Sequence, residues 1–303
     1  MSHLLSLFAN NVLPIMLAAG AGYLVAKYVG IDPRSISQIA FKIFIPCLLF
    51  ELLTTSQLAN EDILRMGGFA IVSVLALGGV TWVLARILHY NNKMISALLL
   101  VVMFGNAGNY GLSLNLFAFG EQALAYASVY FSISIILINT VGLVIASLGN
   151  ADLKKAMVDL LKTPAVYALV LAIIFNVAGR QLPGPLQRTV SILADGSIPL
   201  MIVLMGIQLY HVQGDRHIFT LLGASFMRLV AAPAIVLPIA LAFGLQGASF
   251  QAAITESAMP TAVMMTMVAT EYNAQPAFVT MAVALTTLLS PLTITPLLAL
   301  LGA

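Results

Sequence analysis

The sequence reads MFGNAGNYGLSLN from Met103 to Asn115, and this stretch decides how the fold is interpreted. It lies inside an apolar run long enough to cross a lipid bilayer, yet it contains three glycines and three asparagines. Each glycine lowers the stability of a helix interior by about 1 kcal/mol, and freed backbone groups are tolerated at membrane depth only where protein or a water-filled cavity satisfies them. The stretch therefore predicts a helix that is interrupted inside the membrane, at a place shielded from lipid.

Composition places the whole chain in the membrane. Of its 303 residues, 61% are hydrophobic and 8% are charged, and the mean hydropathy is +1.03, so the polar residues are too few to cover a soluble globule. Long apolar segments recur between short polar connections, each close to the ~20 residues that a helix needs to cross a ~30 Å hydrocarbon core. We expect an all-α membrane protein with ten transmembrane helices, at residues 8–29, 36–56, 64–88, 94–119, 122–148, 163–179, 188–210, 217–243, 248–270 and 275–300.

The charge and the reactive residues exclude several classes of function. A net charge of +2 on few ionisable groups offers no basic stripe for nucleic acid. The single cysteine, Cys47, can form neither an internal disulfide nor a cysteine cluster, and no pair of histidines has metal-ligand spacing. The sequence has no HExxH motif, no recognisable Ser-His pair and no Walker-type phosphate loop. We therefore expect no enzyme activity, no cofactor and no bound metal, and any transport must draw on an ion or substrate gradient.

Basic residues fall unequally on the two faces of the predicted bundle. One set of alternate loops carries eight Lys and Arg residues and the other carries three. By the positive-inside rule the first face is cytoplasmic, so both termini of this multi-pass protein are expected outside the cell membrane, inner or plasma. The first apolar run is long and has no Lys or Arg before it, which predicts a retained helix and not a cleaved signal peptide. The eight residues are Lys27, Arg34, Arg86, Lys93, Lys154, Lys155, Lys162 and Arg216, and the three are Arg65, Arg180 and Arg188.

The two halves of the chain echo each other. At a shift of 153 residues, Ile45-Pro46 aligns with Ile198-Pro199. This match and a few others fall at the same places in both hydropathy patterns. We divide the chain into residues 1–150 and 151–303, each with five predicted helices. Because five is odd, the second half enters the membrane with opposite polarity, which gives an inverted repeat of the kind from which many secondary transporters are built.

The same shift aligns the first interruption with a second one. Gly105-Asn106-Ala107 aligns with Ala258-Met259-Pro260, and the proline removes the helical hydrogen bond to the carbonyl of Glu256. The fourth and ninth helices are therefore expected to break at equivalent points and to cross near the midplane, where half-helix N-termini suit an anion such as a carboxylate. The alternative is that the glycines and the proline only permit kinks and close helix packing.

These residues resemble the auxin efflux carrier family, which includes bacterial organic-acid permeases and plant auxin exporters. The resemblance is carried by NVLPIMLAAGAGYLVAK and FKIFIPCLLFELL near the N-terminus, by GNAGNYGLSL, and by SAMPTAVMMTMVATEYNAQPAFVTMAVALTTLLSPLTITPLL near the C-terminus. It implies two inverted five-helix repeats whose helices four and nine cross at the substrate site. It also implies that Asn106 and Pro260 are the crossover asparagine and proline.

The chain departs from that family in two places. Where many relatives have Gly-x-Pro after the first interruption, it has Gly111-Leu112-Ser113, so a hydroxyl stands in place of a rigid kink. The connection between residues 149 and 162 is short and lacks the long hydrophilic loop of the larger plant members. We therefore do not take a plant hormone as the expected cargo.

The predicted substrate-binding residues lie at the two interruptions and are Gly105, Asn106, Asn109, Gly111, Ser113, Met259, Pro260 and Thr261. A lone carboxylate at the depth of Glu256 is protonated, paired or facing water, and we assign it as the proton-coupling residue, with an ion pair to Arg228 as the alternative. Arg228 either draws the anion inward or neutralises Glu256 or Asp195. Asp195 either binds a cation such as Na⁺ beside a proline kink or lies at an interface.

Together these features predict a secondary active transporter of small organic anions, mono- or dicarboxylates such as malate or malonate, that works by alternating access. A sodium-coupled carrier of the bile-acid symporter type is the nearest alternative, and an anion channel is the second. The sequence leaves open which anion is carried, the direction of transport, whether H⁺ or Na⁺ is coupled, and whether the protein is a homodimer.

Overall fold

The computed structural model describes residues 2–55, 58–147, 161, 163–180, 182–210 and 217–303. Regular structure in these residues is helical, apart from one isolated antiparallel bridge between Gly105 and Thr261. Short π-helical turns, labelled η, interrupt several of the α-helices. In chain order the helices are α1 (Ser2–Leu7), η1 (Phe8–Val12), α2 (Leu13–Val29), α3 (Pro33–Ile39), η2 (Ala40–Phe44), α4 (Ile45–Thr55), α5 (Asn60–Ile87), α6 (Asn92–Met103), η3 (Ala107–Leu112), α7 (Ser113–Phe119), α8 (Glu121–Leu137), η4 (Ile138–Gly142), α9 (Leu143–Ala146), α11 (Pro164–Val177), α12 (Gly184–Tyr210), α13 (Ile218–Phe226), η5 (Met227–Ala231), α14 (Ala232–Ala242), α15 (Gly247–Ser257), α16 (Met264–Glu271) and α17 (Pro276–Leu300).

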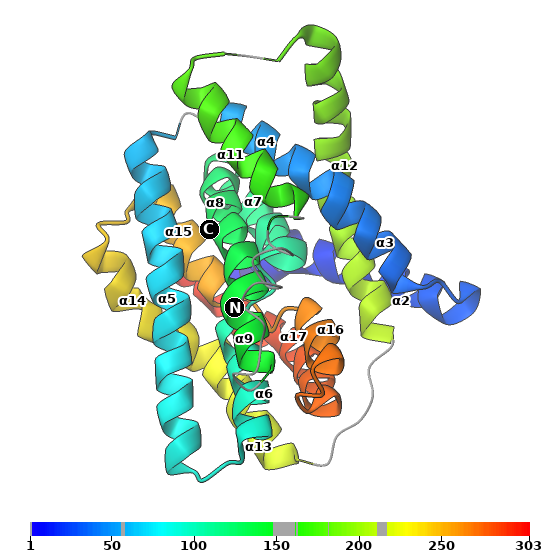
Figure 1. Cartoon of the computed structure of the whole chain (residues 1–303), viewed down its shortest axis with the longest axis vertical. Helices are drawn as coiled ribbons and strands as arrows, with labels where there is room; N and C mark the ends of the chain where they lie inside the picture. Colours follow the sequence, from blue (N-terminus) through cyan, green and yellow to red (C-terminus); the bar gives the residue numbers. More distant parts are fainter. Residues whose placement is uncertain (1, 56–57, 148–160, 162, 181, 211–216) are drawn as a thin grey trace.

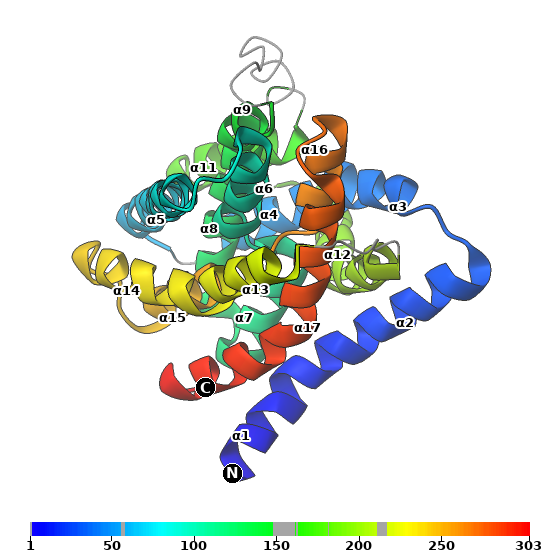
Figure 2. The ribbon, with the colours of Figure 1, turned by 90° about the horizontal axis from the view of Figure 1, so that it is seen from below.

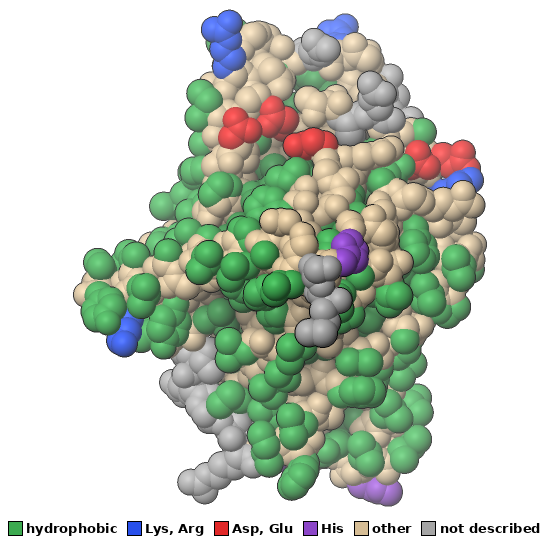
Figure 3. Space-filling model, turned by 180° about the vertical axis from the view of Figure 1, so that it is seen from behind, with side chains coloured by type: hydrophobic (Ala, Val, Ile, Leu, Met, Phe, Trp, Pro, Cys, Tyr) green, Lys and Arg blue, Asp and Glu red, His purple; other side chains and the backbone are tan. Residues whose placement is uncertain are grey.

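Seven helical segments in the described residues are long and apolar enough to cross a membrane. Hydrophobic side chains are spread over the whole face in Figure 3, where acidic and basic side chains occupy only a few places. The chain is therefore a multi-pass, all-helical membrane protein, and the number of ten crossings stays a prediction. The seven segments are His3–Val29, Pro33–Thr55, Glu61–Ile87, Glu121–Ala146, Gly184–Tyr210, Ile218–Ala242 and Pro276–Leu300, and two shorter apolar helices are Asn92–Met103 and Pro164–Asn176.

Ordinary capping chemistry sets many of the helix ends. The Asp32 carboxylate accepts a hydrogen bond from the Arg34 backbone N–H at 3.0 Å, and Pro33 takes the first helical position of α3. The Asn91 side chain accepts from the Met94 N–H at 2.9 Å and starts α6. Gly30 ends α2 in the left-handed conformation, with φ of 73°, which only glycine adopts at little cost. These local signals explain why the predicted segments and the observed helices end at similar residues.

The π-helical turns were not predicted from the sequence. A π turn contains one more residue in each hydrogen-bonded ring than an α turn, and such turns often occur at functional sites. In the described residues, η3 directly follows the first interruption, and η5 carries Arg228. The π turn η3 therefore changes which side chains face inward directly after the first interruption.

The described helices pack as two groups. The small helical group contains α2, α3, α4, α11 and α12, in which α12 packs along α2 and α4, and α11 packs along α4. The large helical group contains α5 to α9 and α13 to α17, in which α8 packs against α5, α7 and α15. In Figure 1, α3 and α12 lie to the right and α5 and α14 to the left, and Figure 2 shows α2 as a long helix along one edge of the molecule.

Two features of the sequence analysis lie outside the described residues. The proposed domain boundary between residues 150 and 151 is one of them. The other is half of the basic residues assigned to the cytoplasmic face, namely Lys154, Lys155, Lys162 and Arg216.

Candidate functional site

Two helices of the large helical group are interrupted, and the interruptions touch. The chain leaves helical geometry between α6 and η3, and again between α15 and α16. The Asn106 N–H donates to the Pro260 carbonyl at 2.7 Å, and the Ala262 N–H donates to the Phe104 carbonyl at 2.9 Å. Gly105 and Thr261 form the antiparallel bridge between these two hydrogen bonds. Backbone groups freed from one helix are thus satisfied by the other, as burial in a membrane requires.

Thr261 holds this contact through its hydroxyl and through its backbone N–H. Its hydroxyl donates to the Val101 carbonyl in α6 at 3.0 Å. Its N–H donates to the hydroxyl of Thr286 in α17 at 3.1 Å. These bonds connect both interrupted helices to α17, so the crossing point is held by three segments of the chain.

Arg228 caps the ends of both interrupted helices. Its side chain is fully buried on η5, with Nε donating to the Met259 carbonyl at 2.6 Å and Nη1 to the Val102 carbonyl at 2.8 Å. These carbonyls lie at the C-terminal ends of α15 and α6, where the helix dipoles are negative and carbonyls lack helical partners. Nη2 has no hydrogen-bond partner and lies beside Gly105, where a Cβ atom would come within 3.0 Å of the guanidinium carbon Cζ. The positive charge of Arg228 therefore offsets the negative C-terminal ends of α15 and α6.

Glu256 lies in the last turn of α15 and is completely buried. Its Oε1 accepts a hydrogen bond from Asn115 Nδ2 at 3.0 Å, and its Oε2 has no partner. Glu256 and Arg228, both within the described part of the chain, form no ion pair with each other. Its carboxylate lies against the backbone of Gly111, where a Cβ atom would come within 2.7 Å of the carbon Cδ.

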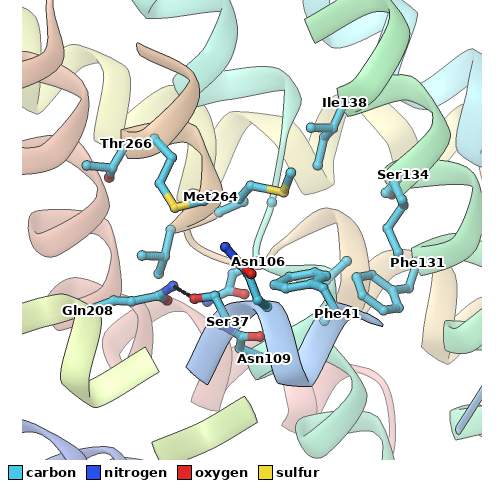
Figure 4. Close-up of a pocket in the computed structure, with 18 of the residues that line it drawn as sticks. Ser37, Phe41, Asn106, Asn109, Phe131, Ser134, Ile138, Gln208, Met264 and Thr266 are labelled. Atoms are coloured by element: carbon cyan, nitrogen blue, oxygen red, sulfur yellow. Dashed lines mark hydrogen bonds between the residues drawn. The ribbon is translucent and has the colours of Figure 1, made fainter. Parts of the chain in front are cut away.

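A cavity of about 620 Å³ opens beside the crossing point, between the two helical groups. In Figure 4, Asn106 lies in the middle of the labelled side chains, with Phe41 and Phe131 to one side of it. Gln208 Nε2 donates to Ser37 Oγ at 3.2 Å across the small helical group. The lining of the cavity consists of Arg34, Ser37, Gln38, Phe41, Lys42, Gly105, Asn106, Ala107, Gly108, Asn109, Phe131, Ser134, Ile135, Ile138, Gln208, Ala262, Val263, Met264, Thr266, Met267, Thr270 and Glu271.

Two basic side chains, one acidic side chain and two helix ends lie on the wall of this cavity. η3 and α16 both begin at the wall of the cavity, with Ala107 and Met264 as their first residues. The N-terminus of a helix carries partial positive charge. Exposed Arg34 and Lys42 line it on the small helical group, with Glu271 as the acidic residue of the lining. The remaining walls are mostly apolar, which suits a ligand that buries a carbon skeleton and presents a few polar groups.

The cavity includes some of the predicted binding residues and not others. Gly105, Asn106 and Asn109 line it. The other five lie at the interruptions, are buried, and are not part of its lining. Of these, Gly111 contacts Glu256, the Ser113 hydroxyl donates to the Asn109 carbonyl at 3.3 Å, and Met259, Pro260 and Thr261 take part in the backbone contacts described above.

Asp195 lies away from Glu256 and Arg228, in a second cavity of about 570 Å³. This cavity also lies between the two helical groups, and it contains the carboxylates of Glu51 and Glu121 as well. Along the segment from α3 to α4, the first cavity meets residues 34–42 and the second meets residues 48–55. The two cavities therefore lie at opposite ends of that segment.

Several residues of the site were missed by the sequence analysis. Gln208 and Asn115 are amides inside apolar segments, the same signal that singled out Asn106, and could have been found. Phe41, Phe131 and Met264 look like ordinary packing residues in the sequence, so nothing distinguished them. Their place at the cavity depends on how helices distant in sequence meet.

Comparison with known proteins identifies a family and two relatives. A family described as "Membrane transport protein" matches residues 7–298. An uncharacterized transporter of Methanothermobacter thermautotrophicus is 21% identical over 287 residues, covering 93% of this chain and 94% of that protein. An uncharacterized transporter of Methanocaldococcus jannaschii is 24% identical over 297 residues, covering 93% of this chain and 95% of that protein.

Proposed function

Because the chain belongs to the membrane transport protein family, the auxin efflux carrier family that its motifs resemble, we propose that it is a secondary active transporter of small organic anions. The observation that carries this proposal is the cavity of about 620 Å³ at the crossing point, where two helix N-termini and the amide of Asn106 converge. Helix N-termini stabilise carboxylates through free N–H groups and positive dipole ends. The cargo class is therefore mono- or dicarboxylates such as malate or malonate.

The proposed cargo binds with its carboxylate toward the crossing point. Asn106 and Asn109 supply amide groups there, and both are more than nine-tenths buried. Phe41 and Phe131, whose rings lie beside Asn106 (Figure 4), would then contact the carbon skeleton. Arg34 and Lys42 lie on the lining as exposed cations, and they raise the local concentration of anions before binding.

We also propose the inverted repeat, with ten crossings in two five-helix halves at residues 1–150 and 151–303. Under this repeat α2 corresponds to α11, and α4 corresponds to α12. If α2 contacts α12, then α11 should contact α4 in the same way. The contact of α8 with α15 likewise has that of α17 with α6 as its counterpart. All four contacts occur, which supports a pseudo-twofold relation between the halves.

Transport proceeds by alternating access at the boundary between the two helical groups. The two cavities lie at opposite ends of the segment from α3 to α4, with the crossing point in the wall of the first. A shift of the large helical group along the small one would close one cavity and open the other. The first cavity is assigned to the cytoplasmic face, because Arg34 belongs to the face richer in basic residues.

Uptake into proteoliposomes tests this function. We expect saturable uptake of radiolabelled malate, malonate or lactate, and a fall of about ten- to a hundredfold in the Asn106→Ala variant, since a hydrogen bond to a charged group contributes about 1.5–3 kcal/mol. Asn139→Ala is the matched control, because that half-buried amide donates to the Ile135 carbonyl of its own helix at 2.8 Å. Uptake that rises without saturation would indicate a channel, and no uptake of any carboxylate would refute the cargo class.

A further inference from the structure

The side chain of Asn106 has a hydrogen-bond partner in the other helical group. One N–H of its Nδ2 donates to the thioether Sδ of Met205 at 3.4 Å. Asn106 lies at the first interruption, in the large helical group, whereas Met205 lies on α12, in the small helical group. The two residues are 4% and 0% exposed. The nitrogen of the amide that is proposed to bind the anion is thus held by a buried sulfur atom.

The other end of this amide is open to the first cavity. Asn106 belongs to the cavity lining, whereas Met205 does not. Asn106 Oδ1 accepts no hydrogen bond within the described part of the chain, and it is not one of the enclosed, unpartnered atoms there, so this oxygen contacts the cavity. The oxygens of a carboxylate bind N–H donors and are repelled by another oxygen acceptor. In this structure Asn106 therefore presents to the cavity the end of its amide that does not suit an anion.

The sulfur atom of Met205 selects this orientation. The two ends of an amide have nearly the same shape, so the neighbouring groups decide which way the amide turns. A thioether sulfur accepts hydrogen bonds weakly and donates none, and it therefore favours the nitrogen over the oxygen. A carboxylate is a much stronger acceptor because it is charged. An anion in the cavity would therefore outcompete Met205 for the nitrogen of Asn106.

A second methionine of α12 lies close by and makes no such hydrogen bond in the described part of the chain. Met201 and Met205 are four residues apart, so they lie on the same face of the helix. A Cβ atom on Gly108 would lie 3.1 Å from Met201 Cε, which places Met201 against η3. Both methionines are 0% exposed. Met201 therefore resembles Met205 in burial and in its place against η3, and differs in its contact with Asn106.

We propose that Met205 is a positioning residue that holds the amide nitrogen of Asn106 toward α12 until the carboxylate of the cargo replaces the sulfur as acceptor. This role rests on the proposed function. When the cargo binds, the amide turns and Nδ2 donates to the carboxylate. The apparent dissociation constant is the intrinsic one divided by the fraction of amides whose nitrogen already faces the cavity. Because Met205 keeps this fraction low, it sets the affinity for the cargo without touching it.

Uptake into proteoliposomes tests this role, with radiolabelled malate, malonate and lactate as probes. Met205→Leu keeps the volume of the side chain and removes the acceptor, so KM should fall by about two- to tenfold while kcat changes little. Met205→Gln supplies an amide oxygen, which is a stronger acceptor, so KM should rise. Met201→Leu is the matched control and should leave KM unchanged. If Met205 were only a packing residue, its two variants would change KM in the same direction.

Thermal unfolding tests the hydrogen bond itself in the absence of any anion. Met205→Leu, Asn106→Ala and the double variant form a cycle that measures the coupling between the two side chains. We expect Met205→Leu to lower Tm less when residue 106 is already alanine, because the hydrogen bond is then already lost. The same cycle with Met201→Leu should be additive.

Three results would overturn the role of Met205. The first is a KM that is the same in the wild type and in both Met205 variants. The second is a KM that moves in one direction in both variants. The third is additivity in the Met205 cycle. Failure of the proposed function looks different: no uptake of any of the three anions refutes that function and this role with it, whereas saturable uptake together with any of the three results refutes only the role of Met205.

Discussion

The hydrogen atom of Gly111 is what allows a carboxylate to lie against the backbone of a broken helix. The ideal Cβ atom of an alanine at this position would overlap Glu256, and both residues are fully enclosed. Gly105 plays the same part for the Arg228 guanidinium. These two glycines therefore provide space for buried charged groups in addition to weakening the helix.

Replacing Gly111 by alanine should lower the stability of the folded protein. Overpacking of a filled interior costs about 1–3 kcal/mol, and here the displaced group is a carboxylate that cannot move to solvent. Thermal unfolding in detergent measures the change. Gly79→Ala in α5 is the control, because no atom lies within 4 Å of its added methyl group, and it should leave Tm unchanged or slightly raised. Equal effects of the two substitutions would contradict the packing described here.

The charged residues were recognisable in the sequence, but their partners were not. Arg228 and Glu256 are conspicuous inside apolar segments, so burial could be predicted. The ion pair considered as the alternative role for Glu256 is absent, since Arg228 binds carbonyls instead. Every residue has a carbonyl group, and only the three-dimensional course of the interrupted helices decides which carbonyls lack a partner. The roles assigned to both residues in substrate and proton coupling stay predictions.

Two glycines lie where α2 and α12 pack against each other in the small helical group. An alanine methyl group at Gly206 would come within 2.6 Å of the Ala19 carbonyl carbon, and one at Gly22 within 3.0 Å of the Val203 carbonyl carbon. Small residues let helix backbones approach closely, which is a main source of helix association in membranes. This pair of glycines therefore sets the distance between α2 and α12.

Gly206→Ala should push these helices apart and lower stability by about 1–3 kcal/mol, since backbone atoms cannot yield as a flexible side chain can. Gly20→Ala, on α2 itself, has open space around the added methyl group and is the matched control. Thermal unfolding of both variants, measured side by side, provides the comparison. Loss of stability in the control but not in Gly206→Ala would show that α2 and α12 are not held by this contact.

Helix limits were largely predictable because they depend on local chemistry. The segment expected at residues 217–243 corresponds to α13, η5 and α14 over 218–242, and the one expected at 275–300 corresponds to α17. Proline and glycine mark such ends in the sequence. The π turns were not predictable, since one extra residue in a turn leaves the apolar pattern of a fully apolar segment unchanged. Of the residues that line the first cavity, only Gly105, Asn106 and Asn109 were predicted as binding residues.

The two cavities lie at opposite ends of the segment from α3 to α4, so chemical labelling can test from which side of the membrane each one is accessible. On a Cys47→Ala background, a cysteine at Gln38 should react with a membrane-impermeant maleimide from the cytoplasmic side. A cysteine at Thr55, in the second cavity, should react from the outside. Ser2→Cys, near the N-terminus, should share the outside reactivity if both termini lie there.

The pattern of labelling distinguishes the outcomes. Reaction of both cavity cysteines from one side would contradict their placement at opposite ends of the α3 to α4 segment. Reaction from opposite sides with the faces exchanged would keep the two cavities but reverse the orientation derived from the basic residues. Addition of a transported anion should change the two rates in opposite directions if the cavities open in alternation.

The meeting of Gly105 with Thr261 uses main-chain atoms, and these are identical in every amino acid apart from proline. A substitution at a neighbouring side chain that faces the cavity therefore leaves the main-chain hydrogen bonds between the two interrupted helices in place. Descendants of one ancestral gene can exchange such side chains and acquire new cargoes while inheriting the same crossing. This junction therefore allows the cavity to change by a few substitutions while the helical framework stays the same.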